Sequence, residues 1–175
     1  MKKILVVIIS FSFVSCVLGQ NLFRVPEPTT EQKHDRMIYM FWANIVPGIS
    51  FAKTKNFTPY EYGTYIGKQF APYWDKDAGF KAYAQGILSS WAYFLREKDS
   101  SIVIEEESEK LLIFKVPAGV ITDYFGENGL IGVSVEEMVE TMNGSHEQIS
   151  SYLNCTSKME LQEKWITVTV HNSIE

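Results

Sequence analysis

The sequence has few cysteines, few glycines and no excess of basic residues, and each shortage excludes a class of protein. Two cysteines among 175 residues are too few for a disulfide-dense scaffold, and 11 glycines are too few for a collagen-like chain. Sixteen basic side chains face 21 acidic ones, and the formal net charge is −5. A protein that binds nucleic acid through electrostatic attraction needs a basic face, so no nucleic-acid partner is expected.

Apolar residues are plentiful. Hydrophobic residues make up 46% of the chain and aromatic residues 14%, which excludes a disordered protein. The sequence shows no internal repeat and no low-complexity tract. A chain of this length is naturally a single domain, because one core can serve it.

The first nineteen residues have the layout of a secretory signal peptide. Lys2 and Lys3 form a basic start, and residues 4–14 are apolar apart from two serines. Val17 and Gly19 occupy positions −3 and −1 of a cleavage site before Gln20. The apolar run is shorter than the roughly 20 residues that span a bilayer. We therefore expect export to the periplasm or the extracellular space of a bacterium.

A second cleavage site overlaps the first. Residues 13–16, Phe-Val-Ser-Cys, resemble a bacterial lipobox, in which Cys16 would carry the lipid. Phe13 departs from that pattern. A membrane-anchored lipoprotein is thus the alternative to a free exported protein, and the membrane is expected as a partner only through this anchor or the signal peptide. After the cut at Gln20, Cys155 is the only remaining cysteine, so no internal disulfide is expected.

Residues 20–29 read as an extended leader because prolines interrupt them, and residues 30–175 are predicted to form one α+β domain. The first helix is predicted from Thr29 or Thr30 to Val46, where Pro47 would end it. Within it, residues 37–43 are apolar nearly all round. A helix of that kind is normally covered by a partner.

The second helix has a clear start. Thr58 and Glu61 form a capping box around Pro59, and Pro72 is expected to end the element. Gly63 and Gly67 fall inside this helix and together cost about 2 kcal/mol relative to alanine. Close contact with another helix is the favoured explanation for them, and close approach of a ligand to bare backbone is the alternative.

A third helix is predicted over residues 77–98, because apolar residues recur with helical spacing for roughly six turns. Residues 101–106 and 110–116 are short runs rich in isoleucine, valine, leucine and phenylalanine, and they predict a β-hairpin with its turn at 107–109. Residues 117–133 read as irregular. A helix capped by Ser134 is expected to end at Asn143-Gly144, followed by a short helix from Ser145. The chain closes with a hairpin over 156–171. The sequence thus predicts about five helices packed on an antiparallel sheet of two hairpins.

Aromatic side chains crowd the second and third predicted helices. Buried tyrosine and tryptophan need partners for their polar atoms, and small-ligand sites combine apolar walls with a few polar groups. We predict a pocket for a small apolar or aromatic ligand, bordered by Tyr62, Tyr65, Tyr83 and Trp91. An ordinary core is the alternative interpretation. No histidine pair has metal-ligand spacing, so no metal and no cofactor are expected.

The segment Tyr65-Ile66-Gly67-Lys68, followed by a long helix, a hairpin, a helix and a terminal hairpin, resembles the vinyl-reductase-like domain. That domain is related to the haem–nitric-oxide-binding-like fold, and the order is also similar to that of small amino-thiazoline carboxylate hydrolases. The likeness covers about residues 60–170. It implies an α+β fold that binds small hydrophobic compounds between helices and sheet. The family's cysteine cluster is reduced here to Cys155, and no catalytic residue is carried over.

Three functions follow as hypotheses. The first is a non-catalytic, exported module that binds a small molecule. The second is a small hydrolase, for which Asp123, Glu127 and Cys155 are the available nucleophiles or bases. The third is an envelope protein-interaction subunit that docks through residues 37–43. The oligomeric state is left open.

Overall fold

The computed structural model describes residues 28–95, 102–126 and 129–173. The chain divides into two units, residues 1–30 and residues 31–175. The predicted signal peptide, Cys16, nearly all of the leader and Glu127 lie outside the described residues.

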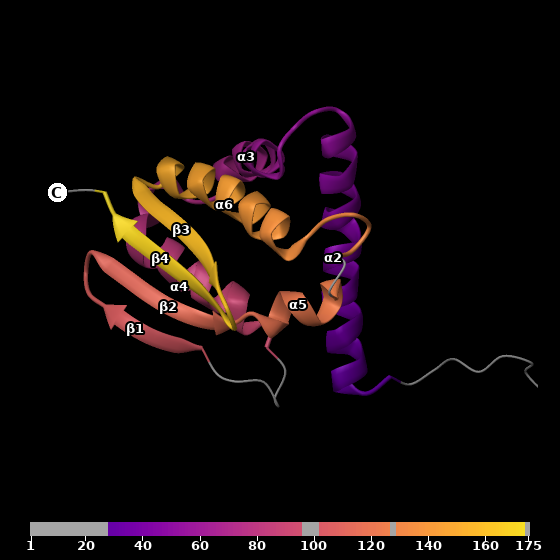
Figure 1. Cartoon of the computed structure of the whole chain (residues 1–175). Helices are drawn as coiled ribbons and strands as arrows, with labels where there is room; N and C mark the ends of the chain where they lie inside the picture. The colour runs from indigo at the N-terminus through magenta and orange to yellow at the C-terminus, as the bar shows by residue number, and fades with distance from the viewer. Residues whose placement is uncertain (1–27, 96–101, 127–128, 174–175) are drawn as a thin grey trace, which may run out of the picture. The chain divides into compact units, whose positions relative to one another are not determined.

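Within the described part of the second unit, five α-helices accompany a four-stranded antiparallel sheet (Figure 1). The strands are β1 (Val103–Glu107), β2 (Leu111–Pro117), β3 (Cys155–Gln162) and β4 (Trp165–Asn172), in the order β1-β2-β4-β3. Both predicted hairpins are present, and their inner strands β2 and β4 pair with each other. The predicted α+β class is therefore confirmed.

The helices are α2 (Thr30–Thr54), α3 (Pro59–Phe70), α4 (Gly79–Ala92), α5 (Gly119–Phe125) and α6 (Val135–Tyr152). Two 3₁₀ turns, Ala71–Tyr73 and Lys76–Ala78, join α3 to α4. One face of the sheet is buried in alternation, and its apolar side chains share a single core with the helices. Of the helices in the described ranges, none has the length and hydropathy of a membrane span.

Pro47 does not end the first helix, contrary to the prediction. Helix α2 continues through it to Thr54. A proline inside a helix costs about 3 kcal/mol. The turns that follow Pro47 bury Ile49 and Ala52, which offsets that cost. Gly48 lies against the hydroxyl of Tyr62, where a β-carbon would overlap, so this glycine allows α2 and α3 to approach closely.

The described residues form about as many helices as predicted, but the helices do not all cover the predicted residues. Residues 119–125, predicted to be irregular, form α5, which buries Val120, Ile121 and Phe125. The two short helices predicted around Asn143-Gly144 are a single helix, α6. Helix α4 is shorter than predicted and ends at Ala92. Both predicted capping boxes, at Thr58 and Ser134, are present.

Helices α3 and α6 make the closest helix contact of the fold. A β-carbon on Gly63 would overlap the carbonyl of Thr141, and one on Gly67 would overlap the carbonyl of Ser145. From the other side, Gly144 of α6 meets the carbonyl of Tyr60. The glycines of α3 thus lie against helix backbone, and α6 occupies the space that a ligand would need.

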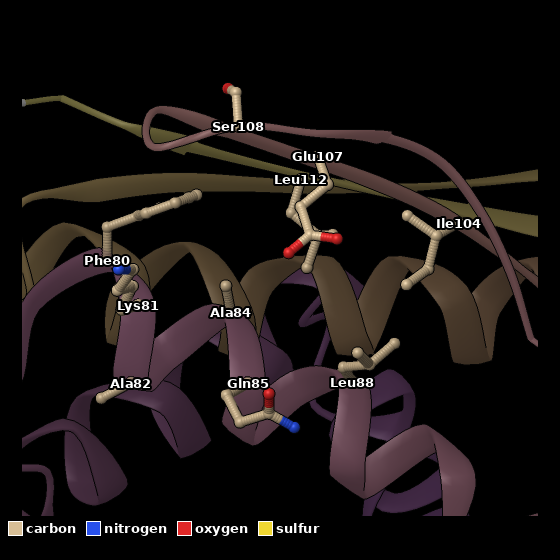
Figure 2. Close-up of a pocket in the computed structure, with 10 residues that line it drawn as sticks. All are labelled: Phe80, Lys81, Ala82, Ala84, Gln85, Leu88, Ile104, Glu107, Ser108 and Leu112. Carbon is tan, nitrogen blue, oxygen red and sulfur yellow. The ribbon is translucent and has the colours of Figure 1, made fainter.

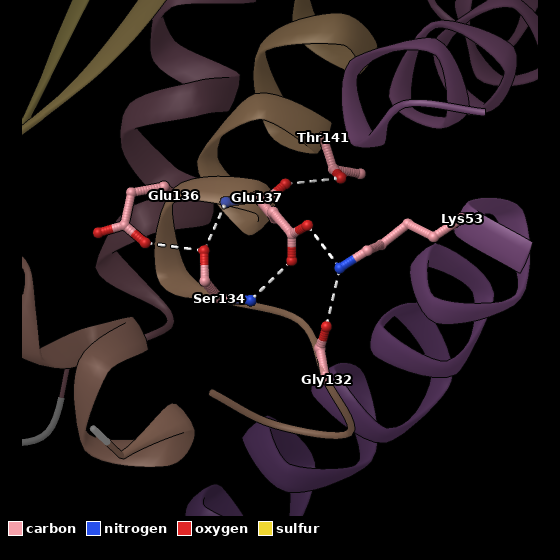
Figure 3. Close-up of polar contacts among 6 residues, drawn as sticks. All are labelled: Lys53, Gly132, Ser134, Glu136, Glu137 and Thr141. Atoms are coloured by element: carbon pink, nitrogen blue, oxygen red, sulfur yellow. Dashed lines mark hydrogen bonds and ion pairs between the residues drawn. The ribbon is translucent and has the colours of Figure 1, made fainter. Parts of the chain in front are cut away.

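A polar network ties α2 to the start of α6 (Figure 3). The Lys53 ammonium pairs with the Glu137 carboxylate and donates to the carbonyl of Gly132 at 2.9 Å. The same carboxylate accepts the Ser134 N–H at 2.9 Å, which completes the capping box. One glutamate therefore serves both the helix cap and the contact between helices.

Strand β1 lies at one edge of the sheet and contains a β-bulge at Glu105. Ile104 and Glu107 stand opposite the buried Phe114 and Leu112, so they share the helix-facing side. The bulge accounts for this, because one extra residue reverses which side the following residues face. Strand β3 forms the other edge.

Candidate functional site

An open groove of about 410 Å³ lies among α2, α4 and α6. Its lining side chains are mostly apolar. They are Met37, Ile38 and Phe41 of α2; Ile87, Ser90, Trp91, Tyr93 and Phe94 of α4 and the turn after it; and Met142 and His146 of α6. This volume is within the range of small-ligand sites.

Helical spacing brings these side chains together. Ile87 and Trp91 lie four residues apart on α4, and Ile38 and Phe41 lie three apart on α2. The two helices are held together at their ends, where the His34 ring lies 2.8 Å, through Nε2, from the carbonyl oxygen of Tyr93. Two segments more than 45 residues apart along the chain therefore form one apolar wall.

An aromatic cluster supports the groove from beneath. The Phe94 ring stacks on Trp42 at 5.6 Å and meets Phe41 edge-on at 5.0 Å. Trp91 lies 6.1 Å from Phe94, and Phe125 of α5 meets Trp42 edge-on. Such edge and offset contacts contribute about 0.5–1.5 kcal/mol each beyond burial. The cluster holds the floor of the groove while Phe41 remains 38% exposed.

His146 brings a titratable group to the groove. Its Nδ1 lies 3.1 Å from the hydroxyl oxygen of Tyr83, which is itself fully buried. Burial lowers the pKa of His146 from 6.5 to about 4, and burial also raises the pKa of Tyr83. Both groups are therefore neutral near pH 7.

The four side chains predicted to border one pocket do not do so. Trp91 lines the groove, and Tyr83 lies behind its wall in contact with His146. Tyr62 packs against Gly48 instead, and Tyr65 is 62% exposed on α3. Tyr62 and Tyr65 therefore lie outside this groove, because α6 and α2 cover the inner sides of α3.

Trp91 is the only predicted site residue among the described residues that line the groove, and the residues missed include Phe41, Phe94 and His146. The apolar run at 37–43 was the signal for Phe41, since a helix without a polar side needs a partner. The sequence predicts the start of a short helix at Ser145, which would place His146 in its first turn. His146 lies in the middle of α6, because that helix does not break at Gly144.

The hydrolase candidates within the described residues lie away from the groove. Asp123 is exposed on α5, and Cys155 is buried on β3 with its thiol 3.4 Å from the carbonyl of Leu153. Burial raises the pKa of the Cys155 thiol, which disfavours the thiolate nucleophile. The described ranges hold no group of three or more histidine, cysteine or acidic residues placed to bind a metal.

A second hollow, also about 410 Å³, lies between α4 and the β1–β2 hairpin (Figure 2). Phe80, Leu88 and Ile104 give it apolar walls, and Lys81 and Gln85 lie at its border. The Glu107 carboxylate points from β1 toward α4. An apolar ligand here would strip water from that carboxylate, which is costly. The groove beside α2 is the better candidate for an apolar compound.

No family model, no curated protein and no solved structure matches this chain significantly. The resemblance to the vinyl-reductase-like domain therefore remains a prediction.

Proposed function

We propose that this domain binds a small, largely apolar molecule in the groove formed by α2, α4 and α6, without catalysing a reaction. The supporting observation is that large apolar side chains stay accessible there. Met37 is 50% exposed and Phe41 38% exposed, beside the buried Trp91. Contiguous exposed apolar surface marks an interaction site in a soluble domain.

We propose a non-catalytic function because of the side chains that line the groove. The polar groups of the wall are neutral His146 and the hydroxyls of Ser90 and Tyr93. The Ser90 hydroxyl donates to the carbonyl of Gly86, and the described residues that line the groove include no carboxylate and no cysteine. General acid–base work near pH 7 needs a group that titrates near pH 7. Binding needs only apolar enclosure and one or two hydrogen bonds.

Titration with the uncharged fluorophore N-phenyl-1-naphthylamine tests this function. We expect saturable binding with a Kd of about 100 μM or tighter, from the usual affinity per heavy atom of such compounds. Ser90→Trp would fill the groove and weaken binding at least tenfold. Gln85→Trp is the matched control, because it lies on the same helix but borders the other hollow. Equal loss in both variants, or no saturable binding at all, would contradict the proposal.

Docking of a protein on the same helix is the second candidate function. Tyr39 and Met40 are 53% and 45% exposed on α2, next to the groove. Light scattering coupled to size exclusion tests the simplest form, which is a dimer. A dimer in the unmodified protein that Met40→Lys converts to a monomer would favour this candidate over ligand binding.

Export is part of the proposal and rests on residues 1–19. Their basic start, apolar run and small residues before Gln20 have the pattern of a cleaved signal. The intact mass of protein purified from the envelope fraction decides between the two cuts. Cleavage before Gln20 gives an unmodified start, whereas a lipoprotein starts at Cys16 and carries acyl chains. A chain that retains Met1 in the cytoplasmic fraction would refute export.

A further inference from the structure

We propose that His146 is the polar anchor of the groove, and that its Nε2–H selects ligands that carry a hydrogen-bond acceptor on an apolar body. The ligand class is thus a neutral carbonyl compound, such as an aryl ketone, an aldehyde or an amide. This inference rests on the proposed binding function and adds the chemistry of recognition to it.

The geometry begins with the Tyr83 hydroxyl. Its oxygen lies 3.1 Å from Nδ1 of His146 and 3.1 Å from the main-chain carbonyl oxygen of the same residue. The hydroxyl has one proton to donate. The carbonyl lies within α6, where the helical pattern already gives it an N–H donor. We therefore assign the hydroxyl proton to Nδ1, and this assignment is the step that the tautomer measurement below tests.

The tautomer of His146 follows from that bond. In a neutral imidazole one nitrogen accepts and the other carries the proton. Because Nδ1 accepts from Tyr83, the proton is on Nε2. No protein partner for Nε2 occurs within the described ranges, and His146 lines the groove. Nε2–H is consequently the donor available to a bound molecule.

The other polar side chains of the wall, Ser90 and Tyr93, are less suited to donate a hydrogen bond to a bound molecule. The Ser90 hydroxyl donates back to the carbonyl of Gly86 at 2.8 Å, within its own helix. Tyr93 is 72% exposed, so water satisfies its hydroxyl. His146 is half-buried and borders the groove, so an acceptor on the ligand would give its Nε2–H a hydrogen bond within the apolar wall. A carboxylate is disfavoured, because neutral His146 offers it no opposite charge in an apolar wall.

A matched pair of probes tests this directly. 2-Acetylnaphthalene and 2-ethylnaphthalene have nearly the same shape, and only the first carries a carbonyl. We expect the protein to bind the ketone about fivefold more tightly, which corresponds to the roughly 1 kcal/mol of one neutral hydrogen bond. His146→Leu should bind both probes equally, because it keeps the wall apolar and removes the donor.

Tyr83 acts as a positioning residue, and its own readout is spectroscopic. In ¹⁵N-labelled protein, the His146 ring should show a protonated Nε2 and an unprotonated Nδ1, assigned by comparison with His146→Leu. Tyr83→Phe removes the hydroxyl and should shift the ring toward a mixture of tautomers and reduce the preference for the ketone. If Tyr83→Phe fails to fold, the tautomer in the unmodified protein still decides this step.

The outcomes separate this inference from the function on which it rests. If both probes bind equally to the unmodified protein and Ser90→Trp blocks both, the groove is a binding site and the anchor is wrong. A proton on Nδ1 instead of Nε2 would likewise overturn the anchor. If neither probe binds, the proposed function itself fails.

Discussion

The side chain of Asn143, on α6, pairs with both main-chain groups of Met159 on β3. Its Nδ2 donates to the Met159 carbonyl at 2.8 Å, and its Oδ1 accepts the Met159 N–H at 2.7 Å. The amide thus does for this outer strand what a neighbouring strand would do. This explains why a residue that usually ends helices stands in the middle of α6.

Asn143→Ala should lower the free energy of unfolding by about 1–3 kcal/mol, because two main-chain groups lose their partner at once. Alanine favours helix, so the loss measured is the hydrogen-bonding effect reduced by a small gain in propensity. Urea titration measures it, and amide exchange at Met159 should become faster. Glu140→Ala, at an exposed position on the same helix, is the control. A cost below about 0.5 kcal/mol would show that the pairing adds nothing to stability.

Gly63→Ala should destabilise the domain by more than about 2 kcal/mol, although alanine normally stabilises a helix by about 1 kcal/mol. The added methyl would overlap backbone of α6, which cannot rotate away as a side chain can. Gly119→Ala is the matched control. Its methyl would meet only the Asp123 side chain at an ordinary 3.4 Å. We expect that variant to be neutral or stabilised in thermal unfolding, and similar melting temperatures for the two variants would contradict the close contact.

The stability of the domain should fall as the pH decreases from 6.5 to about 4. In this window the unfolded chain binds a proton at His146 that the folded state excludes, because burial lowers the folded pKa to about 4. Unfolding then takes up protons, so its free energy rises with pH. The His146 contribution is at most about 3 kcal/mol. His146→Leu should flatten the curve over this range, and an unchanged slope would mean that His146 is solvated.

Two substitutions at Glu137 distinguish the contribution of the helix cap to stability from that of the ion pair. Glu137→Gln keeps the cap, because glutamine also accepts the Ser134 N–H, and removes only the charge pair with Lys53. We expect a cost of about 0–1 kcal/mol, since both partners are partly exposed. Glu137→Ala removes both roles and should cost about 1–2 kcal/mol. Urea titration measures the free energy of unfolding of both variants. Equal losses in the two would show that the cap contributes nothing to stability.

Local features were predictable where the signal and the structure are local. The capping boxes at Thr58 and Ser134 depend on residues three apart, and the alternation of Ile166, Val168 and Val170 directly reflects a half-buried strand. The sheet of two hairpins follows from the same patterns.

Tertiary contacts decided the rest. Pro47, Asn143 and Gly144 look like helix ends locally, yet each lies inside a helix, where packing or a strand contact outweighs propensity. The groove was missed because its walls come from α2 and α4, whose juxtaposition no local pattern indicates. The aromatic excess of the sequence does form a cluster in the structure. Its rings meet between α2 and α4, however, and not around Tyr62 and Tyr65.

The bulge at Glu105 bears on how this chain behaves in crowded solution. A free outer strand offers unpaired amide and carbonyl groups to any other chain in extended form, which is how amyloid-like assembly starts. The bulge interrupts the regular spacing of those groups, and Glu107 places a charge on the inner side of the strand. Removing Glu105 would straighten β1 and leave Glu106 and Glu107 on their present sides, opposite Ile113 and Leu112. Loss of the bulge should make the protein precipitate at concentrations that the unmodified chain tolerates.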